Sequence, residues 1–538
     1  MRIGIDLDNT LICYDKVFIA SAITFGLVNK NWEGNKEQLR AYIRQLPNGE
    51  YQWQLLQGYV YSEAVINAEA FPGVFRFLWR AKLKGCQLFI VSHKTKFAHH
   101  DSSKNLRTPA LKWLKEKKFF NRSMNSLVDE VYFLSTLEEK IEKFNKLNLD
   151  VLIDDLKEVI EHPLLESKIK SFHFGGEQFT SWMGIENNLL GHISKKDCYK
   201  LIENLSMGDP SFCQVYKGGG NSSVWKVEIK DSPPLTIKYY HNDSAHNDRR
   251  VIEKLAISVM QKNGIDNIPR IVSTDSDIEV SVFEHIDAKV IKTLNESKIK
   301  EVSVFIEKLN VIKEKITSDF PLASGACLSG ADIFKQINFR LLNLENARLE
   351  NDELDRFILD KFNPFLEILE KWVKENWPNK TEFSKPLEIS KQTLTPSDLG
   401  AHNMLEDDEG SIYFIDFEYF GLDDPVKTTS DFLWHPKNKI DIEIGNYWVM
   451  LMTSIFNKTD PDFSQRLAIS WPVYGLCWCL ILLNEYRNND WQKRIQSKGY
   501  LQSEYTAIKN EQLEKANNLL DFIKLNYQKF PYVNKVQE

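Results

Sequence analysis

Asp6-Leu7-Asp8-Asn9-Thr10 follows an apolar run, Arg2 to Ile5, at the N-terminus of this chain. The run predicts a short buried strand, and alternate residues of an extended chain point to the same side, so both carboxylates can face one crevice. Open α/β sheets bind ligands at the carboxyl ends of their strands. Because two adjacent carboxylates repel each other, the pattern favours a site for a hard divalent cation such as Mg²⁺. A solvated turn at the end of a strand is the alternative.

The length and composition describe a large globular protein. A chain of 538 residues predicts about two to four domains, since one core seldom organises so many residues. Hydrophobic residues make up 43% and charged residues 27%, and the net charge of −7 gives no overall attraction for nucleic acid. Seven scattered cysteines form no CxxC pair, so we expect no zinc site, no disulfides and a cytoplasmic location.

One apolar run needs a separate interpretation. The stretch from Ala468 to Leu483 is shorter than the roughly 20 residues that span a bilayer. It contains Pro472, and we interpret it as a buried helix that follows a turn. We therefore expect no membrane insertion.

Strands alternate with helices through the first part of the chain, which predicts a parallel, doubly wound α/β sheet. After the N-terminal strand, the predicted strands are Cys86–Val91, Val131–Leu134, Val151–Ile153 and Ser171–Phe174. Ser92 follows one of these strands, Asp154 and Asp155 follow another, and Lys140 lies on a predicted helix nearby. We expect these side chains to meet the N-terminal acids at one edge of the sheet.

With these motifs, residues 1–178 resemble a haloacid dehalogenase superfamily phosphatase, whose first motif is DxDxT. The resemblance implies that Asp6 is the nucleophile that forms an aspartyl-phosphate and that Asp8 protonates the leaving oxygen and later activates water. It implies that Ser92 hydrogen-bonds the phosphoryl group and that Lys140 neutralises its charge. The implied Mg²⁺ ligands are Asp6, the carbonyl of Asp8, Asp154 and, as a further candidate, Asp155. Residues 14–70 resemble the superfamily's helical cap, which favours a small substrate.

Residues 179–207 are expected to form a connector, and a second domain is expected at 208–530. It opens on a predicted hairpin whose turn contains Gly219, Gly220, Asn221 and Ser222. The following strand, Leu235–Tyr240, carries Lys238 in an apolar stretch, and the next helix carries Glu253. A buried lysine needs an anionic partner, which Glu253 or a nucleotide phosphate can supply.

Further along, an acid, an amide five residues later and a second acid after a strand are typical of the protein-kinase catalytic set. These residues are Asp398, Asn403 and Asp416. With them, residues 208–530 resemble the aminoglycoside phosphotransferase and choline kinase group, whose α+β fold is that of the protein kinases and whose members phosphorylate small molecules.

The resemblance implies ATP and Mg²⁺ as cofactors and a role for each residue. Asp398 would accept the proton of the acceptor hydroxyl, while Asn403 and Asp416 would hold Mg²⁺. Lys238 would bind the ATP phosphates and pair with Glu253, and the backbone of Gly219–Ser222 would cover those phosphates. In one place the sequence departs from the family: Pro396-Ser397 replaces the usual His-Gly before the base. We expect the rigidity lost with that histidine to be made up elsewhere.

The aromatic residues of the C-terminal helices allow two interpretations. They could form a cation-binding cage for an amino alcohol, but aromatic residues at helical spacing more often belong to a core, which we favour. The residues in question are Trp434, Trp448, Trp471, Tyr474, Trp478 and Trp491.

Together the two resemblances predict a bifunctional enzyme. Its phosphatase and kinase halves would act on different positions of a small sugar or amino-alcohol precursor of surface polysaccharide, because action on one oxygen would waste ATP. The expected partners are a small-molecule phosphate ester and a small-molecule alcohol acceptor, with no nucleic acid, and the sequence does not indicate an oligomeric state. Two alternatives stay open: one domain is inactive and senses nucleotide or ligand for the other, or the kinase acts on an antibiotic.

Overall fold

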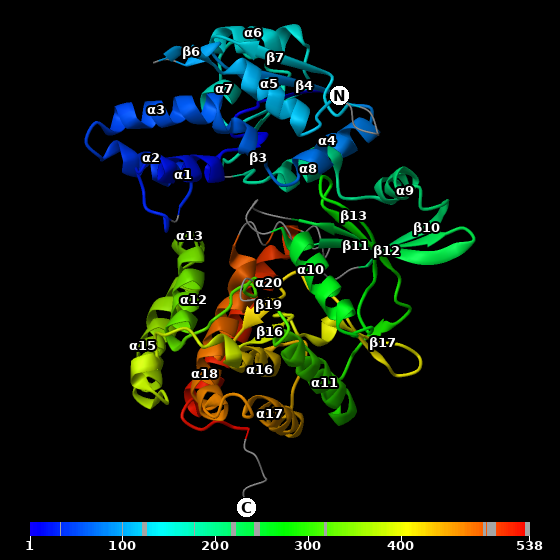
Figure 1. The fold of residues 1–538 in the computed structure, drawn as a ribbon, viewed down its shortest axis with the longest axis vertical. Helices are drawn as coiled ribbons and strands as arrows, with labels where there is room; N and C mark the ends of the chain where they lie inside the picture. Colours follow the sequence, from blue (N-terminus) through cyan, green and yellow to red (C-terminus); the bar gives the residue numbers. More distant parts are fainter. Residues whose placement is uncertain are drawn as a thin grey trace, which may run out of the picture. The chain divides into compact units, whose positions relative to one another are not determined.

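The computed structural model describes residues 1–32, 34–98, 101–120, 126–176, 178–216, 222–241, 248–316, 320–487, 491 and 502–532. The chain forms two compact units, each described by itself below (Figure 1). The first comprises Met1–Cys213 with two short segments, Tyr239–Asp248 and Asp275–Val280. The second comprises Gln214–Lys238, Arg249–Thr274 and Ser281–Glu538.

The first unit contains a five-stranded sheet in the order β7-β4-β1-β8-β9, and every pairing in it is parallel. The strands are β1 (Arg2–Ile5), β4 (Gln87–His93), β7 (Glu130–Leu134), β8 (Val151–Asp154) and β9 (Lys170–His173). The predicted parallel sheet is confirmed. After β7 the chain returns to the other side of β1, so the strand order reverses between β1 and β8, where open sheets bind ligands.

Helices α4 (Val74–Leu83), α5 (Arg107–Glu116), α6 (Leu137–Lys146) and α7 (Lys157–Ile160) connect these strands (Figure 1). Helix α6 begins at a capping box in which Thr136 and Glu139 satisfy each other's backbone N–H groups. Its buried face carries Lys140, Ile141 and Phe144, and the two apolar residues share a core with Phe89 and other sheet residues. This packing directs Lys140 toward the sheet.

The insert after the first motif is helical, as predicted. It contains α1 (Asp15–Thr24), α2 (Lys36–Arg44), α3 (Gly49–Ser62) and a short 3₁₀ turn, η1 (Ala64–Asn67). At its base, β2 (Ile12–Cys13) pairs antiparallel with β3 (Glu69–Ala70). The rings of Phe18 and Trp53 stack with centroids 5.1 Å apart, which gives the insert an aromatic core of its own. A further hairpin that the sequence did not suggest, β5 (Phe97–Ala98) with β6 (Asp101–Asn105), follows β4.

Residues 179–207, expected as a connector, contain two helices that belong to the first unit, α8 (Trp182–Leu190) and α9 (Lys195–Asn204). Arg80 of α4 is fully buried and pairs with Glu186 at 2.9 Å and with Asp197 at 3.1 Å. Asp197 also forms the capping box of α9 with Ser194. The polar residues that suggested irregular chain are therefore caps, ion-pair partners and the outer face of a helix.

A second five-stranded sheet has the order β10-β11-β12-β14-β13. Its strands are β10 (Pro210–Tyr216), β11 (Ser222–Ile229), β12 (Ser232–Tyr240), β13 (Ile271–Asp275) and β14 (Val280–Glu284), and α10 (Arg249–Lys262) lies between β12 and β13 in sequence. Two smaller sheets follow. They are formed by β15 (Lys289–Val290) with β17 (Met404–Glu406) and β18 (Ile412–Phe414), and by β16 (Thr393–Thr395) with β19 (Gly421–Asp423).

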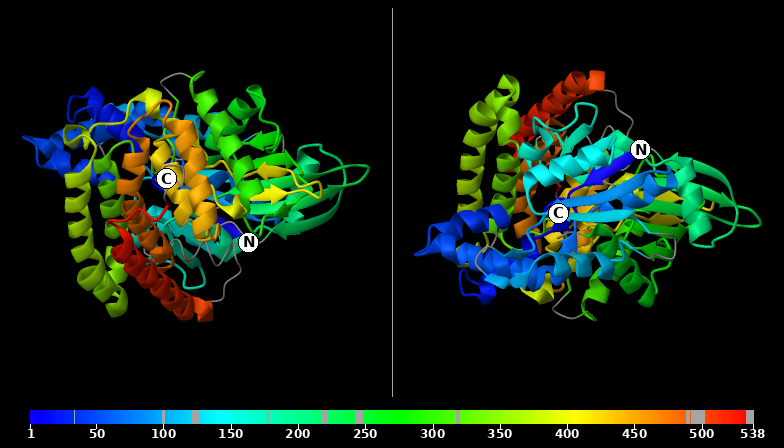
Figure 2. Two further views of the ribbon diagram at one scale, coloured as in Figure 1. Left: turned by 90° about the horizontal axis from the view of Figure 1, so that it is seen from below. Right: turned by 90° about the horizontal axis from the view of Figure 1, so that it is seen from above.

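The rest of the second unit is mainly helical. Its longer helices are α11 (Glu296–Lys313), α12 (Gly330–Asn343), α15 (Asn363–Asn376), α16 (Pro425–Trp434), α17 (Ile442–Phe456), α18 (Phe463–Leu482) and α20 (Tyr505–Asn526). Shorter turns are α13 (Glu345–Leu349), α14 (Asp352–Arg356), the π-helix η2 (Phe357–Phe362), and 3₁₀ turns at Lys380–Glu382, Ile389–Lys391, Ala401–Asn403, Leu483–Tyr486 and Gln502–Glu504. Helix α18 packs against α12, α16 and α20 (Figures 1 and 2).

The predicted turn before the apolar helix is wrong, because α18 runs straight through Pro472. Proline leaves one helical carbonyl without its usual partner, but packing on three sides holds the helix together. Within the described ranges, one stretch, Phe463–Tyr486, is long and apolar enough to cross a membrane. In its most apolar window 72% of the residues are buried inside the protein, as in a core helix.

The aromatic residues that could have formed a cage lie mostly in the core. Trp448, Trp471, Tyr474 and Trp491 are each at most 1% exposed. Trp434 stacks on Trp471 with ring centroids 4.4 Å apart and donates its indole N–H to the Trp471 carbonyl at 2.8 Å. These contacts agree with the core interpretation.

A buried ion-pair network joins the start of α16 to α18. Arg466 of α18 contacts both carboxylate oxygens of Asp424 and lies 2.6 Å from Asp460, and all three residues are buried. Asp424 also caps α16 by accepting the Val426 N–H at 2.9 Å. We expect Arg466→Met to lower the free energy of unfolding, measured in urea, by about 3–5 kcal/mol, because buried Asp424 loses its counter-ion and Asp460 keeps only the more distant Lys391 at 3.5 Å.

The matched control for this variant is Lys371→Met, which removes a cationic side chain from α15. That change should alter the free energy of unfolding by less than about 0.5 kcal/mol. A loss below about 1 kcal/mol for Arg466→Met would show that the network contributes little.

Candidate active sites

Three acids meet in the first unit at the carboxyl ends of β1 and β8. Oxygen atoms of Asp6, Asp154 and Asp155 all lie within 4.8 Å of one another. The Asp6 N–H donates to the Ile153 carbonyl at 2.9 Å, which fixes the end of β1 against β8. Asp154 is the last residue of β8, and both Asp6 and Asp154 are buried. The strand ends therefore bring these three predicted metal ligands together.

Lys140 lies between two of these acids. Its ammonium is 2.6 Å from Asp6 Oδ1 and 2.7 Å from Asp154 Oδ2, and the side chain is 1% exposed. Burial raises the pKa of Asp6 to about 7, with further contributions from Asp154 and Asp8, although Lys140 opposes the shift. Burial alone would lower the pKa of Lys140, but the two carboxylates raise it, so the lysine stays charged. A fixed positive charge thus lies where a phosphoryl group would need one.

Ser92 lies one strand away, inside β4 rather than after it as predicted, because β4 extends to His93. The side chain is 1% exposed, and its hydroxyl has no hydrogen-bond partner within the described part of the chain. A buried hydroxyl without a partner costs about 1–3 kcal/mol, so such a group favours an additional ligand that accepts its hydrogen bond.

Asp8 contributes to the raised pKa of Asp6 and has two polar partners of its own. Lys94 makes an ion pair with Asp8 Oδ2, and the Tyr14 hydroxyl donates to Asp8 Oδ1 at 2.6 Å. Burial alone would raise the pKa of Asp8, but the Lys94 ammonium and the Tyr14 hydroxyl lower it below its usual value. Sequence reasoning missed Lys94, although it stands two residues after Ser92, the spacing at which residues of an extended chain face the same side.

One residue of the helical insert reaches the first motif. Lys36, the first residue of α2, donates to Asn9 Oδ1 at 2.7 Å and to the Tyr61 hydroxyl at 3.2 Å. Asn9 has a positive φ of 58° and also donates to Asp155 at 3.3 Å. The insert is therefore in contact with the loop that carries the two acids.

The residues at the end of β1 suit Mg²⁺, because the ion prefers carboxylate oxygens and three of them converge here. Metal ligands must lose their protons, and burial raises the pKa of Asp6 to about 7 and that of Asp155 to about 6. We expect the affinity for Mg²⁺, measured by titration calorimetry, to rise as the pH increases from about 5.5 to 7.5. Between about pH 6 and 7 the gain should approach about tenfold per pH unit, one proton being displaced, and the affinity should level off above about pH 7.

The control is Asp6→Asn, which should weaken Mg²⁺ binding and remove the dependence near pH 7. The remaining dependence, that of Asp155, should lie below about pH 6, because the charge of Asp6 contributes to the raised pKa of Asp155. An affinity that stays constant over the whole range would contradict the assignment of these carboxyls as ligands.

The second unit holds another buried lysine among acids. Lys238 of β12 lies 2.8 Å from Glu253 of α10, 2.6 Å from Asp416 and 3.5 Å from Glu418. Glu253 also accepts the Phe417 N–H at 3.1 Å, which ties α10 to the segment after β18. The structure therefore brings Lys238 and Glu253 together, as predicted, and adds Asp416 to the pair.

Asp398 and Asn403 lie in the loop between β16 and β17. Asn403 donates its side-chain N–H to the Asp398 carbonyl at 3.1 Å, and its backbone carbonyl accepts the N–H of Ile415, next to Asp416, at 3.0 Å. This leaves the amide oxygen of Asn403 and the carboxylate of Asp416 as hard donors suited to Mg²⁺. Ser397 and Asp416 both have positive φ values, 66° and 68°. Glycine adopts this conformation without strain, whereas Ser397 and Asp416 carry a side chain in it.

The glycine-rich loop is only partly described. Gly219, Gly220 and Asn221 lie outside the described residues, while Ser222 is buried at the start of β11. The role proposed for this loop therefore stays a prediction.

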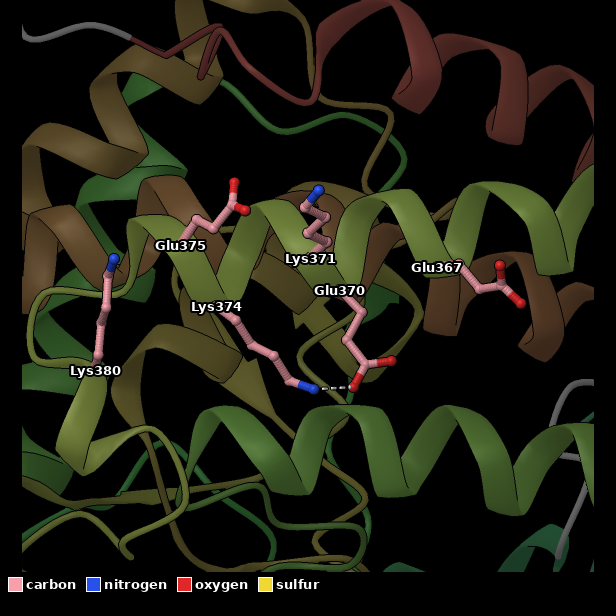
Figure 3. Close-up of a pocket in the computed structure, with 6 residues that line it drawn as sticks. All are labelled: Glu367, Glu370, Lys371, Lys374, Glu375 and Lys380. Atoms are coloured by element: carbon pink, nitrogen blue, oxygen red, sulfur yellow. Dashed lines mark hydrogen bonds and ion pairs between the residues drawn. The ribbon is translucent and has the colours of Figure 1, made fainter.

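A surface cavity of about 540 Å³ lies elsewhere, on α15 and the turn after it (Figure 3). Its lining residues are Glu367, Glu370, Lys371, Lys374, Glu375 and Lys380. Lys374 and Glu370 neutralise each other at 2.6 Å, and the cavity contains none of the predicted site residues. The residues at the two clusters, rather than this cavity, define the candidate sites.

Several solved structures are similar to this chain. Spectinomycin phosphotransferase APH(9)-Ia, in complex with ADP and spectinomycin, is 14% identical over 62% of this chain and 99% of its own, with a TM-score of 0.44. Choline kinase from Cryptosporidium parvum is 16% identical over 62% and 98%, with a TM-score of 0.41. Plasmodium vivax ethanolamine kinase is 14% identical over 65% and 93%, with a TM-score of 0.38.

No protein-family model and no curated protein matches the chain. The three structures are named as a spectinomycin phosphotransferase, a choline kinase and an ethanolamine kinase. The chemistry proposed below rests on the residues of the two sites.

Proposed function

We propose that this protein is an ATP-dependent small-molecule kinase that carries a second, Mg²⁺-dependent phosphatase site in its N-terminal part. One observation carries the proposal: each unit contains its own buried lysine bridging two acids. Lys140 contacts Asp6 and Asp154, and Lys238 contacts Glu253 and Asp416. Both phosphate hydrolysis and phosphate transfer need a fixed positive charge beside ligands for magnesium.

In the first unit, Asp6 is the proposed nucleophile because its carboxylate lies at a strand end beside Lys140. Attack on phosphorus breaks the bond to the leaving oxygen and forms an aspartyl-phosphate, while Lys140 and Ser92 hold the phosphoryl oxygens. Asp8 is the proposed base for the hydrolytic water and the proposed proton donor to the leaving oxygen, a role for which its carboxylate, ionised beside Lys94, would first have to take up a proton. A bound Mg²⁺ would neutralise charge on the transferring group, held by Asp6, Asp154 and Asp155.

In the second unit, Asp398 is the proposed base that accepts the proton of the acceptor hydroxyl. Lys238, held by Glu253, is the proposed contact for the ATP phosphates, and Asn403 and Asp416 would hold Mg²⁺, which would neutralise negative charge on those phosphates. These residues do not determine which acceptor or which phosphate ester the protein uses. A small sugar or amino-alcohol precursor of surface polysaccharide, modified at two positions, fits the presence of both sites on one chain.

The test is an incubation of the protein with Mg²⁺, ATP and a panel of sugars, sugar phosphates and amino alcohols. ADP and inorganic phosphate are followed separately. With some acceptors, we expect the protein to form ADP without releasing inorganic phosphate. With some phosphate esters, we expect it to release inorganic phosphate in the absence of ATP. A protein that binds Mg-ATP and releases phosphate from esters, but never releases ADP with any acceptor, would favour the alternative in which one unit is a nucleotide sensor.

A further inference from the structure

The base proposed for the kinase has unusual neighbours. The family's histidine two residues before the base is absent, because Pro396 occupies its place. Instead, His435, the residue that ends α16, directs Nε2 at Asp398 Oδ1 from 3.3 Å. His402 lies farther away, with Nε2 at 3.6 Å from Asp398 Oδ2. A histidine 37 residues beyond the base in sequence thus contacts it directly.

The hydrogen bond at His435 Nδ1 shows which ring nitrogen carries the proton when the imidazole is neutral. The Lys437 N–H donates to His435 Nδ1 at 3.1 Å. A ring nitrogen that accepts a hydrogen bond carries no proton, so a neutral His435 has its proton on Nε2. That nitrogen faces Asp398 Oδ1 at 3.3 Å, so its proton points toward one oxygen of the carboxylate, while the other oxygen has His402 Nε2 at 3.6 Å.

The ring of His435 is held from several sides. It is 9% exposed, and its backbone N–H donates to the Asp431 carbonyl at 2.9 Å. The Trp478 ring meets it edge to face at 4.9 Å, and the His402 ring stacks on it at 5.1 Å. Trp478 is fixed in turn by its indole N–H, which donates to Asp431 Oδ1 at 2.9 Å. These contacts hold the His435 ring in one orientation.

The loop that carries the base leaves space for this ring. A side chain at Gly400 would place its Cβ 2.4 Å from His402 Nδ1 and 2.6 Å from His435 Cε1, so only glycine fits beside both histidines. Asn438 then joins the loop to the end of α16. Its side chain accepts the Ala401 N–H at 2.7 Å and donates to the Phe432 carbonyl at 2.9 Å.

We propose that His435 is the positioning residue for Asp398, and that it supplies from the end of α16 the rigidity that the replacement by Pro396-Ser397 removes. This inference rests on the proposed kinase function. His435 touches neither ATP nor acceptor in this proposal. It holds one carboxylate oxygen so that the other faces the acceptor hydroxyl.

The test compares two substitutions of His435. His435→Phe keeps a ring but loses the N–H, and we expect kcat for ADP release to fall by about 10–100-fold with the KM for ATP unchanged, since misplacing a base by about 1 Å has an effect of this size. His435→Gln restores an N–H of similar reach and should recover most of kcat. Gly400→Ala, which crowds both rings, should resemble His435→Phe, and thermal melting shows whether each variant is folded.

Three results would overturn the inference: a kcat for His435→Phe within about twofold of the unsubstituted protein, a His435→Gln variant as slow as His435→Phe, or a KM for ATP that rises as kcat falls. A long-range ¹H–¹⁵N spectrum of histidine-labelled protein gives a readout independent of turnover. It should assign the proton of His435 to Nε2, and an Nδ1–H tautomer would overturn the proposal. An Nε2–H signal in a protein that never releases ADP would instead count against the kinase function.

Discussion

Asp6→Asn is expected to abolish phosphate release from phosphate esters while ATP-dependent release of ADP continues. The substitution keeps the shape of the side chain but replaces the attacking carboxylate by an amide, which is a poor nucleophile at phosphorus. Removal of a covalent nucleophile typically lowers kcat by about 10⁴-fold or more, so residual activity should be near background. The measurement is inorganic phosphate released from the best ester of the panel, with ADP release followed in parallel.

The matched control is Asp150→Asn. It removes an aspartate just before β8, at the opposite end of that strand from Asp154, where the side chain accepts the Arg2 N–H. Phosphate release should survive this change. If Asp6→Asn retained more than about a tenth of the phosphatase activity, Asp6 would not be the nucleophile. If it also stopped ADP release, the idea of two independent sites would fail.

Asp398→Ala is expected to have the reverse effect, with ADP release lost and phosphatase activity kept. Without the carboxylate, the acceptor hydroxyl has no group to take its proton, and the loss of a general base lowers kcat by about 10²–10⁴-fold. ATP should still bind, because Lys238 and Asp416 are unchanged and contact each other independently of Asp398. The measurements are the rate of ADP release with a responsive acceptor and the affinity for Mg-ATP.

Asp408→Ala serves as the control, since it removes an aspartate that is 96% exposed in the turn between β17 and β18. Its ADP release should match that of the unsubstituted protein. Full activity in Asp398→Ala would exclude this residue as the base. Equal loss in both variants would indicate damage to the fold rather than to the chemistry.

Sequence reasoning predicted the features that depend on short, continuous stretches of the chain. The order of strands and helices in the first unit and the acids at the ends of β1 and β8 follow from apolar runs that end in polar residues. The position of Lys140 follows from its place on the buried face of α6, next to Ile141. The capping box at Thr136 also allows the start of that helix to be predicted from the sequence.

The features that it missed depend on tertiary packing. Pro472 predicts a turn by local rules, but α18 continues because neighbouring helices hold it on several sides. Helix α9 was missed because a surface helix with many lysines has the composition of a loop. His435 could not be assigned to Asp398 from sequence, since no spacing rule connects the end of α16 with the loop after β16.

The ammonium of Lys140 has a consequence for how the protein responds to the supply of magnesium. Because this side chain offsets part of the negative charge of Asp6 and Asp154, we expect the N-terminal unit to stay folded without metal. Chelation should therefore switch off the proposed hydrolysis reversibly and lower the melting temperature only by the amount that a bound ligand contributes, so that cellular magnesium would set the rate of turnover more than the lifetime of the protein.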